Sequence, residues 1–294
     1  MIDLHIHTTY SDGTDSVKEV LTKAEKLGLK AIAITDHENC DAYKEMNDFD
    51  TTEYFSGKIL HGIELKARYT DRVIDILGYN IDCDKMEKYL KECYGKVTRD
   101  QIQEKQLKKF YEYKEECGLI LDDIENLKWN KHTDWASIVF YDELKKHDEN
   151  KDKVPEDMWN SFSVFKRNYY HCKNKIFYVD NSVDYPPLEK IIDIIHKAGG
   201  LAFIAHIYEY AWIGDKIAEL KKIIDNYDVD GIECYHSIFN LEQIDLVKEF
   251  CQSQKLLMSG GSDYHGLHKP GIELGSGKGQ LSIPDDIFKK IVEK

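Results

Sequence analysis

Short apolar segments that end in a histidine or a carboxylate recur along this chain, and they constrain its fold more than any other feature. The first is DLHIH at 3–7; later ones span residues 31–35, 58–64, 72–79, 201–205, 231–235 and 256–259. Most are separated by stretches with helical periodicity, such as residues 16–27, which begin with a capping box and end at Gly28. Strands that alternate with helices are typical of βα units around a parallel sheet, so the sequence predicts an α/β fold.

The composition and the periodicity of the sequence change over residues 83–183. This segment is rich in Lys, Glu, Tyr and Asn, and it shows helical periodicity without βα alternation. We interpret it as a mainly helical insertion that could act as a lid and substrate-specificity subdomain, with its charge runs on solvated helix faces. The alternation resumes afterwards, and we therefore expect residues 1–82 and 184–294 to fold together as one barrel.

Composition limits the partners and the compartment. The 294 residues carry a formal net charge of −14, which argues against binding duplex DNA through phosphate neutralisation. A phosphorylated small molecule or short oligonucleotide stays open as a substrate, because bound cations can reverse the field of an acidic pocket. Seven scattered cysteines without a CxxC pair favour reduced thiols. No apolar run suits a leader or a membrane span, so we expect a cytoplasmic protein without a membrane partner and leave its oligomeric state open.

Histidines and carboxylates gather at the ends of the predicted strands. His5 and His7 lie two residues apart on a strand, so their imidazoles point to one face. Later segments add Asp36, His37, Glu64, Asp75, His206, Asp263 and His265. Ligands bind at the carboxyl ends of parallel strands, and carboxylates gathered there need cations to balance them. The sequence therefore predicts a multinuclear metal site whose mixed ligands favour Mn, Fe or Zn.

These segments resemble, in order, the motifs of the polymerase and histidinol phosphatase (PHP) superfamily, and within it the stand-alone nucleotide phosphoesterases. The matching stretches are DLHIHTTYSDG at 3–13, AIAITDH at 31–37, GIE at 62–64, DILGYNID at 75–82, HKAGGLAFIAH at 196–206, GIECYH at 231–236 and GGSDYHG at 260–266. The resemblance implies a distorted (β/α)7 barrel with two or three divalent ions, of which Mn is favoured. It divides the ligands among three ions, which would bind His5, His7, Glu64 and Asp263; Glu64 and His206; and Asp12, His37 and His265.

Two of the family's motifs are altered in this chain. Asp75 stands where relatives commonly carry His; it would either ligate the second ion and tilt that site toward Mn or Mg, or be a polar strand-end residue beside a weak site. The Arg-x-His-x-Ala motif, which is thought to hold the substrate phosphate, corresponds here to HTDWA at 132–136. Loss of the guanidinium weakens bidentate phosphate recognition. His132, Asp134 and Lys269 are the candidate substrate-binding residues.

The predicted chemistry is hydrolysis of a phosphate ester by a metal-bridged hydroxide, because bound cations lower the pKa of water. Asp36 and His236 are candidate catalytic residues that would assist through water, although Asp36 could instead orient His37. Three hypotheses stay open. The chain could hydrolyse nucleotides (a nucleoside monophosphate, a bisphosphate or a short oligonucleotide), it could be a phosphatase of a small metabolite such as histidinol phosphate, or it could be a metal-binding regulatory module with little catalysis.

Overall fold

The chain folds into two compact units, each described here by itself. The structure is a computed structural model that describes residues 1–94, 99–131 and 133–294. The first unit comprises Met1–Gly95, Tyr185–Tyr208 and Asp215–Lys294, and the second comprises Lys96–Asp184 and Glu209–Gly214. Among the described residues, no helix is both long enough and apolar enough to span a bilayer.

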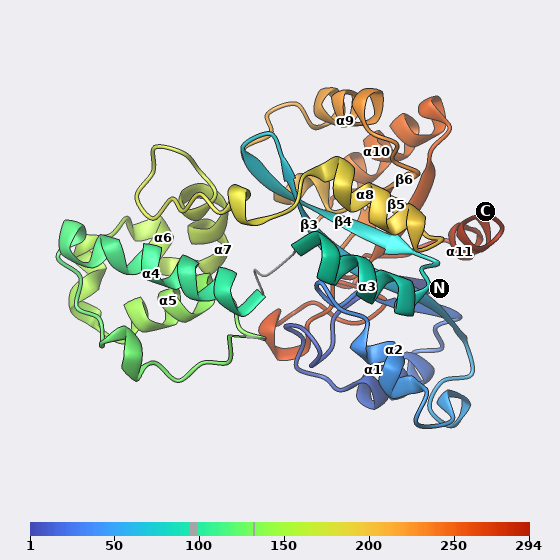
Figure 1. Cartoon of the computed structure of the whole chain (residues 1–294), viewed down its shortest axis with the longest axis horizontal. Helices are drawn as coiled ribbons and strands as arrows, with labels where there is room; N and C mark the ends of the chain where they lie inside the picture. Colours follow the sequence, from blue (N-terminus) through green and yellow to red (C-terminus); the bar gives the residue numbers. More distant parts are fainter. Residues whose placement is uncertain (95–98, 132) are drawn as a thin grey trace. The chain divides into compact units, whose positions relative to one another are not determined.

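Seven strands form a single sheet in the first unit, in the order β1 to β7. Strands β3 to β6 of this sheet are labelled in Figure 1. They are β1 Ile2–Ile6, β2 Ala31–Ile34, β3 Lys58–Tyr69, β4 Arg72–Tyr79, β5 Leu201–Ile204, β6 Gly231–His236 and β7 Leu257–Gly261. The chain just after β7 meets β1 again, where the His7 amide donates to the Tyr264 carbonyl and the Asp263 amide donates to the His5 carbonyl, both at 2.9 Å. The sheet is thus a nearly closed barrel, which confirms the predicted distorted seven-stranded α/β barrel.

Strand β4 is the main distortion of this barrel. Regular alternation predicts parallel neighbours, but β4 runs antiparallel to both β3 and β5, whereas the other pairs are parallel. Only Thr70 and Asp71 separate β3 from β4, and a connection this short can join antiparallel strands but cannot cross over to a parallel one. Because β4 runs in reverse, Asp75 in its first half lies at the barrel end where the parallel strands have their carboxyl ends.

Helices of the first unit pack against these strands. They are α1 Val17–Lys26, α2 Asp41–Met46, α3 Cys83–Tyr94, α8 Leu188–Lys197, α9 Lys216–Asn226, α10 Leu241–Gln254 and α11 Asp285–Val292. Helix α8 contacts β3, β4 and β5, while α10 contacts β6 and β7 and α3 packs on α8. The apolar residues of α1 and α8 recur at helical spacing and are buried along one face of each helix, and their burial stabilises the unit.

The capping box predicted at residues 16–19 is present at the start of α1. The Ser16 hydroxyl accepts from the Glu19 amide, and the Glu19 carboxylate accepts from the Ser16 amide. We expect Ser16→Ala to lower the free energy of unfolding of the first unit by about 1 kcal/mol, because the Glu19 amide in the first turn loses the hydroxyl that accepts its hydrogen bond. Urea denaturation measures this change. Gln252→Ala, an exposed substitution on α10, is the control and should shift stability by less than about 0.5 kcal/mol; an equal shift in both variants would contradict the cap.

The second unit is mainly helical. Its helices are α4 Arg99–Cys117, α5 Ala136–Lys145, α6 Glu156–Asn160 and α7 Phe162–Val164, followed by a π-helical turn at Phe165–Tyr170. Aromatic side chains build its core, in which the Phe110 and Phe140 rings stack at 4.9 Å and Phe165 and Phe177 pack beside them. This core explains the aromatic residues that make the segment unusual in sequence.

Candidate metal centre

All nine predicted metal ligands lie buried at one end of the barrel. Strands β1, β2, β5 and β7 deliver them at or just after their carboxyl ends, whereas Glu64 lies within the long strand β3 and Asp75 within the reversed β4. The exposed fraction of each is 9% or less. Four groups of the first unit, within the described residues, could each hold one ion; they are His7, Asp12, His37 and His265; His5, His236 and Asp263; His5, His7 and Glu64; and Glu64, Asp75 and His206.

Glu64 connects most of these groups. Its Oε2 lies 3.2 Å from the Nε2 atoms of both His5 and His7, and 3.5 Å from His37 Nδ1. Its Oε1 lies 2.8 Å from His206 Nε2. One carboxylate therefore reaches four imidazoles that come from three other strands or their ends, which is the position required of a bridging ligand.

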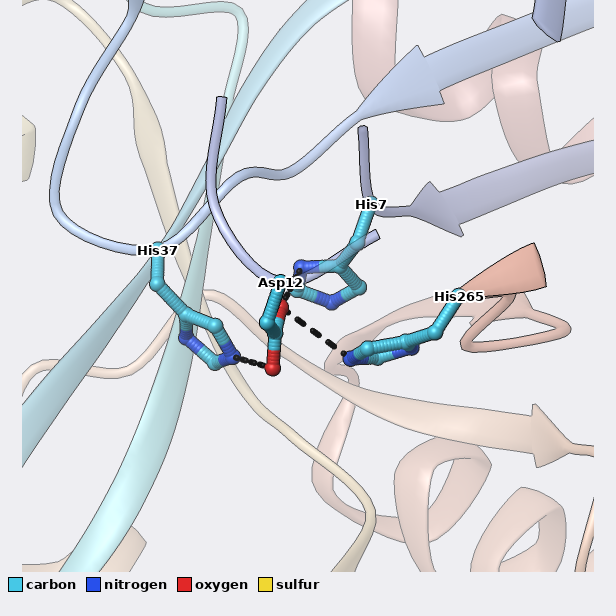
Figure 2. Close-up of side chains that lie close together, drawn as sticks. All are labelled: His7, Asp12, His37 and His265. Carbon is cyan, nitrogen blue, oxygen red and sulfur yellow. Dashed lines mark ion pairs between the residues drawn. The ribbon is translucent and has the colours of Figure 1, made fainter. Parts of the chain in front are cut away.

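Figure 2 shows the group around Asp12, whose loop brings the carboxylate between three imidazoles. Asp12 Oδ1 lies 3.3 Å from His265 Nε2 and 3.5 Å from His7 Nδ1, and Oδ2 lies 3.7 Å from His37 Nε2. His7 and His37 follow neighbouring strands, while His265 follows the last one. Three imidazoles and one carboxylate form a typical ligand set for Mn, Fe or Zn.

Asp263 is the second carboxylate beside the first histidine pair. Its Oδ1 lies 3.5 Å from His5 Nε2 and 3.4 Å from His7 Nε2, so the predicted quartet of His5, His7, Glu64 and Asp263 is brought together. Its Oδ2 lies 3.3 Å from Nε2 of His236, which the sequence analysis treated as a catalytic candidate. His236 thereby stands within reach of an ion held by His5 and Asp263.

The backbone is strained at two of the candidate metal ligands. Asp263 has a φ of 55° and His206 a φ of 23°, a region that non-glycine residues rarely adopt. Such strain costs about 1–3 kcal/mol and concentrates at functional sites. The backbone at Gly261 also passes very close to His5, because a Cβ at Gly261 would lie 2.3 Å from the backbone nitrogen of His5. A glycine is therefore required where β7 passes the first ligand.

The surrounding carboxylates raise the pKa values of the first histidine pair, His5 and His7. Burial alone would lower the pKa of His5, but the charges of Glu233, Glu64 and Asp263 outweigh it and hold this pKa well above its usual value. At His7 burial acts in the same direction, but the nearby carboxylates of Asp263, Glu64 and Asp12 overcome it and raise the pKa to about 9. In the metal-free protein these two imidazoles hold protons that a metal ion must displace.

Burial prevails at the other pair of histidines. It lowers the pKa of His37 well below its usual value, and it lowers the pKa of His265 to about 4. Both imidazoles are therefore neutral near neutral pH and ready to act as ligands.

We expect Mn²⁺ binding near neutral pH to release protons. The pKa of about 9 means that His7 is protonated in the metal-free protein, and only neutral imidazole binds a metal ion. Metal affinity should therefore increase as the pH is raised toward about 9 and decrease as the pH is lowered, because protons then compete with the ion for His7. Calorimetric titration in two buffers of different ionisation enthalpy tests this, and identical apparent enthalpies in both buffers would contradict it.

Two buried carboxylates escaped the sequence analysis. Glu233 Oε1 lies 2.8 Å from His5 Nδ1, and Oε2 accepts from the His206 amide at 2.7 Å, so it orients one ligand directly and holds the backbone of another. Asp3 accepts from the amides of Ser262 and Gly275, which ties β1 to the segments that follow β7. Both could have been found from the sequence, because each is a charged residue within an apolar strand. A carboxylate buried there needs a hydrogen-bond or charge partner.

The remaining predicted residues lie in different surroundings. Asp36 accepts from the Thr8 amide at 2.8 Å and from the Ser11 hydroxyl at 2.5 Å, so it shapes the loop that carries Asp12. Lys269 donates to Asp263. Asp134, in the second unit, accepts from the Asn130 amide at 2.8 Å and closes a local turn. His132 lies outside the described residues.

The donor set fits divalent transition-metal ions. It consists of imidazoles and carboxylates, the ligands that suit Mn, Fe and Zn. Among the described residues, buried His7 Nε2 makes no hydrogen bond, although it lies 3.2 Å from Glu64 Oε2. A ring nitrogen that is close to a carboxylate oxygen but badly oriented for a hydrogen bond is the arrangement expected of two ligands of one ion.

Comparisons with known proteins identify the family to which the chain belongs. The PHP domain matches residues 3–236. A 5′-3′ exoribonuclease of Haemophilus influenzae is 25% identical over 287 residues, which cover 97% of this chain and 96% of the relative. A phosphoribosyl 1,2-cyclic phosphate 1,2-diphosphodiesterase of Eggerthella lenta is 25% identical over 269 residues, covering 90% and 94%. A solved amidohydrolase structure from Chromobacterium violaceum shares the fold, with a TM-score of 0.73, 21% identity and coverage of 99% and 96%.

The barrel and its buried histidine–carboxylate centre thus define a metal-dependent hydrolase. The chain belongs to the PHP family, because the domain covers most of its length. This family and the names of the two relatives support a hydrolase that acts on phosphate esters.

Proposed function

We propose that this chain hydrolyses phosphate esters of nucleotides, such as a nucleoside monophosphate, a bisphosphate or the end of a short oligonucleotide. The single observation that carries the proposal is the position of Glu64 between four imidazoles, with Oε atoms 2.8–3.5 Å from their nitrogens. Support for nucleotides comes from the exoribonuclease relative, which aligns with nearly the whole chain.

The residues of the centre would hold two or three divalent ions, with Mn favoured over Fe and Zn. Bound ions of this kind lower the pKa of water and neutralise charge on phosphate oxygens. Glu64 and Asp263 place negative charge beside His5 and His7, and Asp12 does the same for His37 and His265. The buried walls exclude bulk water, so each charge acts more strongly than it would in solvent.

Groups beside the centre would handle the substrate. His236 is buried against Asp263 and could exchange a proton with the leaving oxygen through water. Lys269 would bind a phosphate oxygen as a point charge, in place of the guanidinium that relatives use. Asp36 would act by positioning the loop of Asp12. For the second unit we propose a role in substrate choice through His132 and Asp134.

A panel of esters tests the proposal. Mn²⁺-loaded enzyme is assayed on nucleoside monophosphates, 3′,5′-bisphosphates, short oligoribonucleotides, a cyclic ribose phosphate, histidinol phosphate and duplex DNA. We expect the highest kcat/KM on a single-stranded nucleotide substrate, no cleavage of the duplex because of the acidic charge, and loss of turnover in His5→Ala.

The other outcomes separate the alternatives. A higher kcat/KM on histidinol phosphate or the cyclic ribose phosphate would assign the chain to small metabolites. Full metal occupancy without turnover of any ester would favour a regulatory metal-binding module and contradict the proposal.

A further inference from the structure

Lys66 lies beside one of the four candidate metal groups, the one formed by Glu64, Asp75 and His206. It stands on β3 two residues after Glu64, so both side chains leave the same face of the strand. In the antiparallel ladder its partner is Asp75 on β4, and Lys66 Nζ lies 2.7 Å from Asp75 Oδ1. The register of two paired strands therefore fixes an ammonium group beside a carboxylate of the Glu64–Asp75–His206 group.

The position of this lysine is set by its surroundings. Its side chain is only 16% exposed, and its backbone amide donates to Glu38 Oε1 at 3.3 Å. The negative charges that act on the ammonium include those of Asp75, Glu38 and Glu64. A buried ammonium group is stable only beside opposite charges. Moving Lys66 away from these carboxylates would leave its charge buried without a counter-charge, which is unfavourable.

A divalent ion in the same group would compete with the ammonium. Asp75 has one oxygen on Lys66, and its other oxygen lies 3.9 Å from His206 Nε2. An ion that binds Asp75 would share one carboxylate with the ammonium, and like charges at such short range repel each other strongly in a buried site.

We propose that the Lys66 ammonium is a built-in cation that takes the place of a metal ion in the Glu64–Asp75–His206 group. The centre then loads metal at its remaining groups only, and Lys66 supplies a fixed positive charge to the phosphate at this side. This inference rests on the metal centre of the proposed function. It lowers the largest number of ions that the centre can hold from three to two.

Lys269 differs from Lys66 in its exposure and in the element that carries it. It also donates to a candidate ligand, Asp263, but its side chain is 37% exposed and stands after a short 3₁₀ turn, Gly266–His268. An exposed lysine on a turn can move aside when a metal ion or a phosphate arrives. Lys66 is held in a strand ladder, so only Lys66 is assigned this role.

Metal counting tests the proposal without any turnover. Metal-free proteins are loaded with excess Mn²⁺, freed of unbound ions, and analysed by inductively coupled plasma mass spectrometry. We expect Lys66→Ala to hold one more equivalent of Mn²⁺ per chain than the wild type, because the vacated group gains an ion. Lys44→Ala, which removes an exposed lysine paired with Asp41 and Glu87, is the matched control and should hold the wild-type amount.

Asp75→Asn gives an independent reading if Lys66→Ala does not fold. The proposal predicts no change in the metal count of Asp75→Asn, since Asp75 binds the lysine and no ion. Loss of one equivalent in Asp75→Asn, or equal counts in the wild type and a folded Lys66→Ala, would overturn it. A wild type that binds metal as expected but cleaves no ester would instead contradict the proposed function alone.

Discussion

Glu64→Gln is expected to lower kcat/KM for phosphate ester hydrolysis by roughly a thousandfold. Metal ions supply several kcal/mol of transition-state stabilisation, and each 1.4 kcal/mol or so corresponds to about a factor of ten in rate. Glu64 touches the imidazoles of His5, His7, His37 and His206. The glutamine keeps the shape of the side chain but removes the charge that a bridging ligand contributes to its ions.

Steady-state kinetics on the best ester of the panel, at saturating Mn²⁺, measures this loss. Glu249→Gln makes the same chemical change at an exposed position on α10 and should keep wild-type kinetics. Circular dichroism shows whether the barrel of Glu64→Gln is folded. A folded Glu64→Gln enzyme with less than about a tenfold loss would mean that Glu64 does not bridge ions used in catalysis.

Glu233→Gln is expected to weaken Mn²⁺ binding by about 10- to 100-fold, the usual effect of losing a carboxylate that orients a ligating histidine. Glu233 Oε1 lies 2.8 Å from His5 Nδ1, and its other oxygen accepts from the His206 amide. When a metal ion displaces one proton of His5, the Glu233 charge favours the tautomer that keeps the other proton on Nδ1, so that Nε2 can bind the ion. The glutamine can present its amide nitrogen to Nδ1 instead, which favours the wrong tautomer.

Calorimetric titration with Mn²⁺ measures the affinity of this variant. Asp230→Asn is a close control, because Asp230 also holds a histidine, with Oδ2 2.8 Å from His196 Nε2, but away from the candidate metal groups. Its Mn²⁺ affinity should match the wild type. An unchanged affinity in Glu233→Gln would show that His5 does not depend on this carboxylate or is not a ligand.

The predictable part of the site follows from strand periodicity. His5 and His7 could be assigned to one face because alternate residues of a strand share a face, and strand ends carry His37, His206 and Asp263 to one edge. These positions are set locally, by the strand that carries each residue, so a single sequence reveals them.

The unpredicted part depends on pairing between segments. The reversed direction of β4 could have been inferred from the two-residue connection, but regular alternation obscured it. The Lys66–Asp75 pair comes from the register of β3 on β4, and the Glu233–His5 pair joins strands 228 residues apart in sequence. Such contacts arise only when the barrel closes, and no local pattern specifies them.

Removal and return of metal ions tests the central claim most directly. The enzyme is stripped with a chelator, shown to be folded by circular dichroism, and titrated with Mn²⁺ while ester hydrolysis is followed. The buried ligand groups predict no turnover in the stripped protein and recovery in proportion to bound metal, which saturates at a small whole number of ions per chain. Undiminished hydrolysis by a folded, metal-free protein would contradict the account.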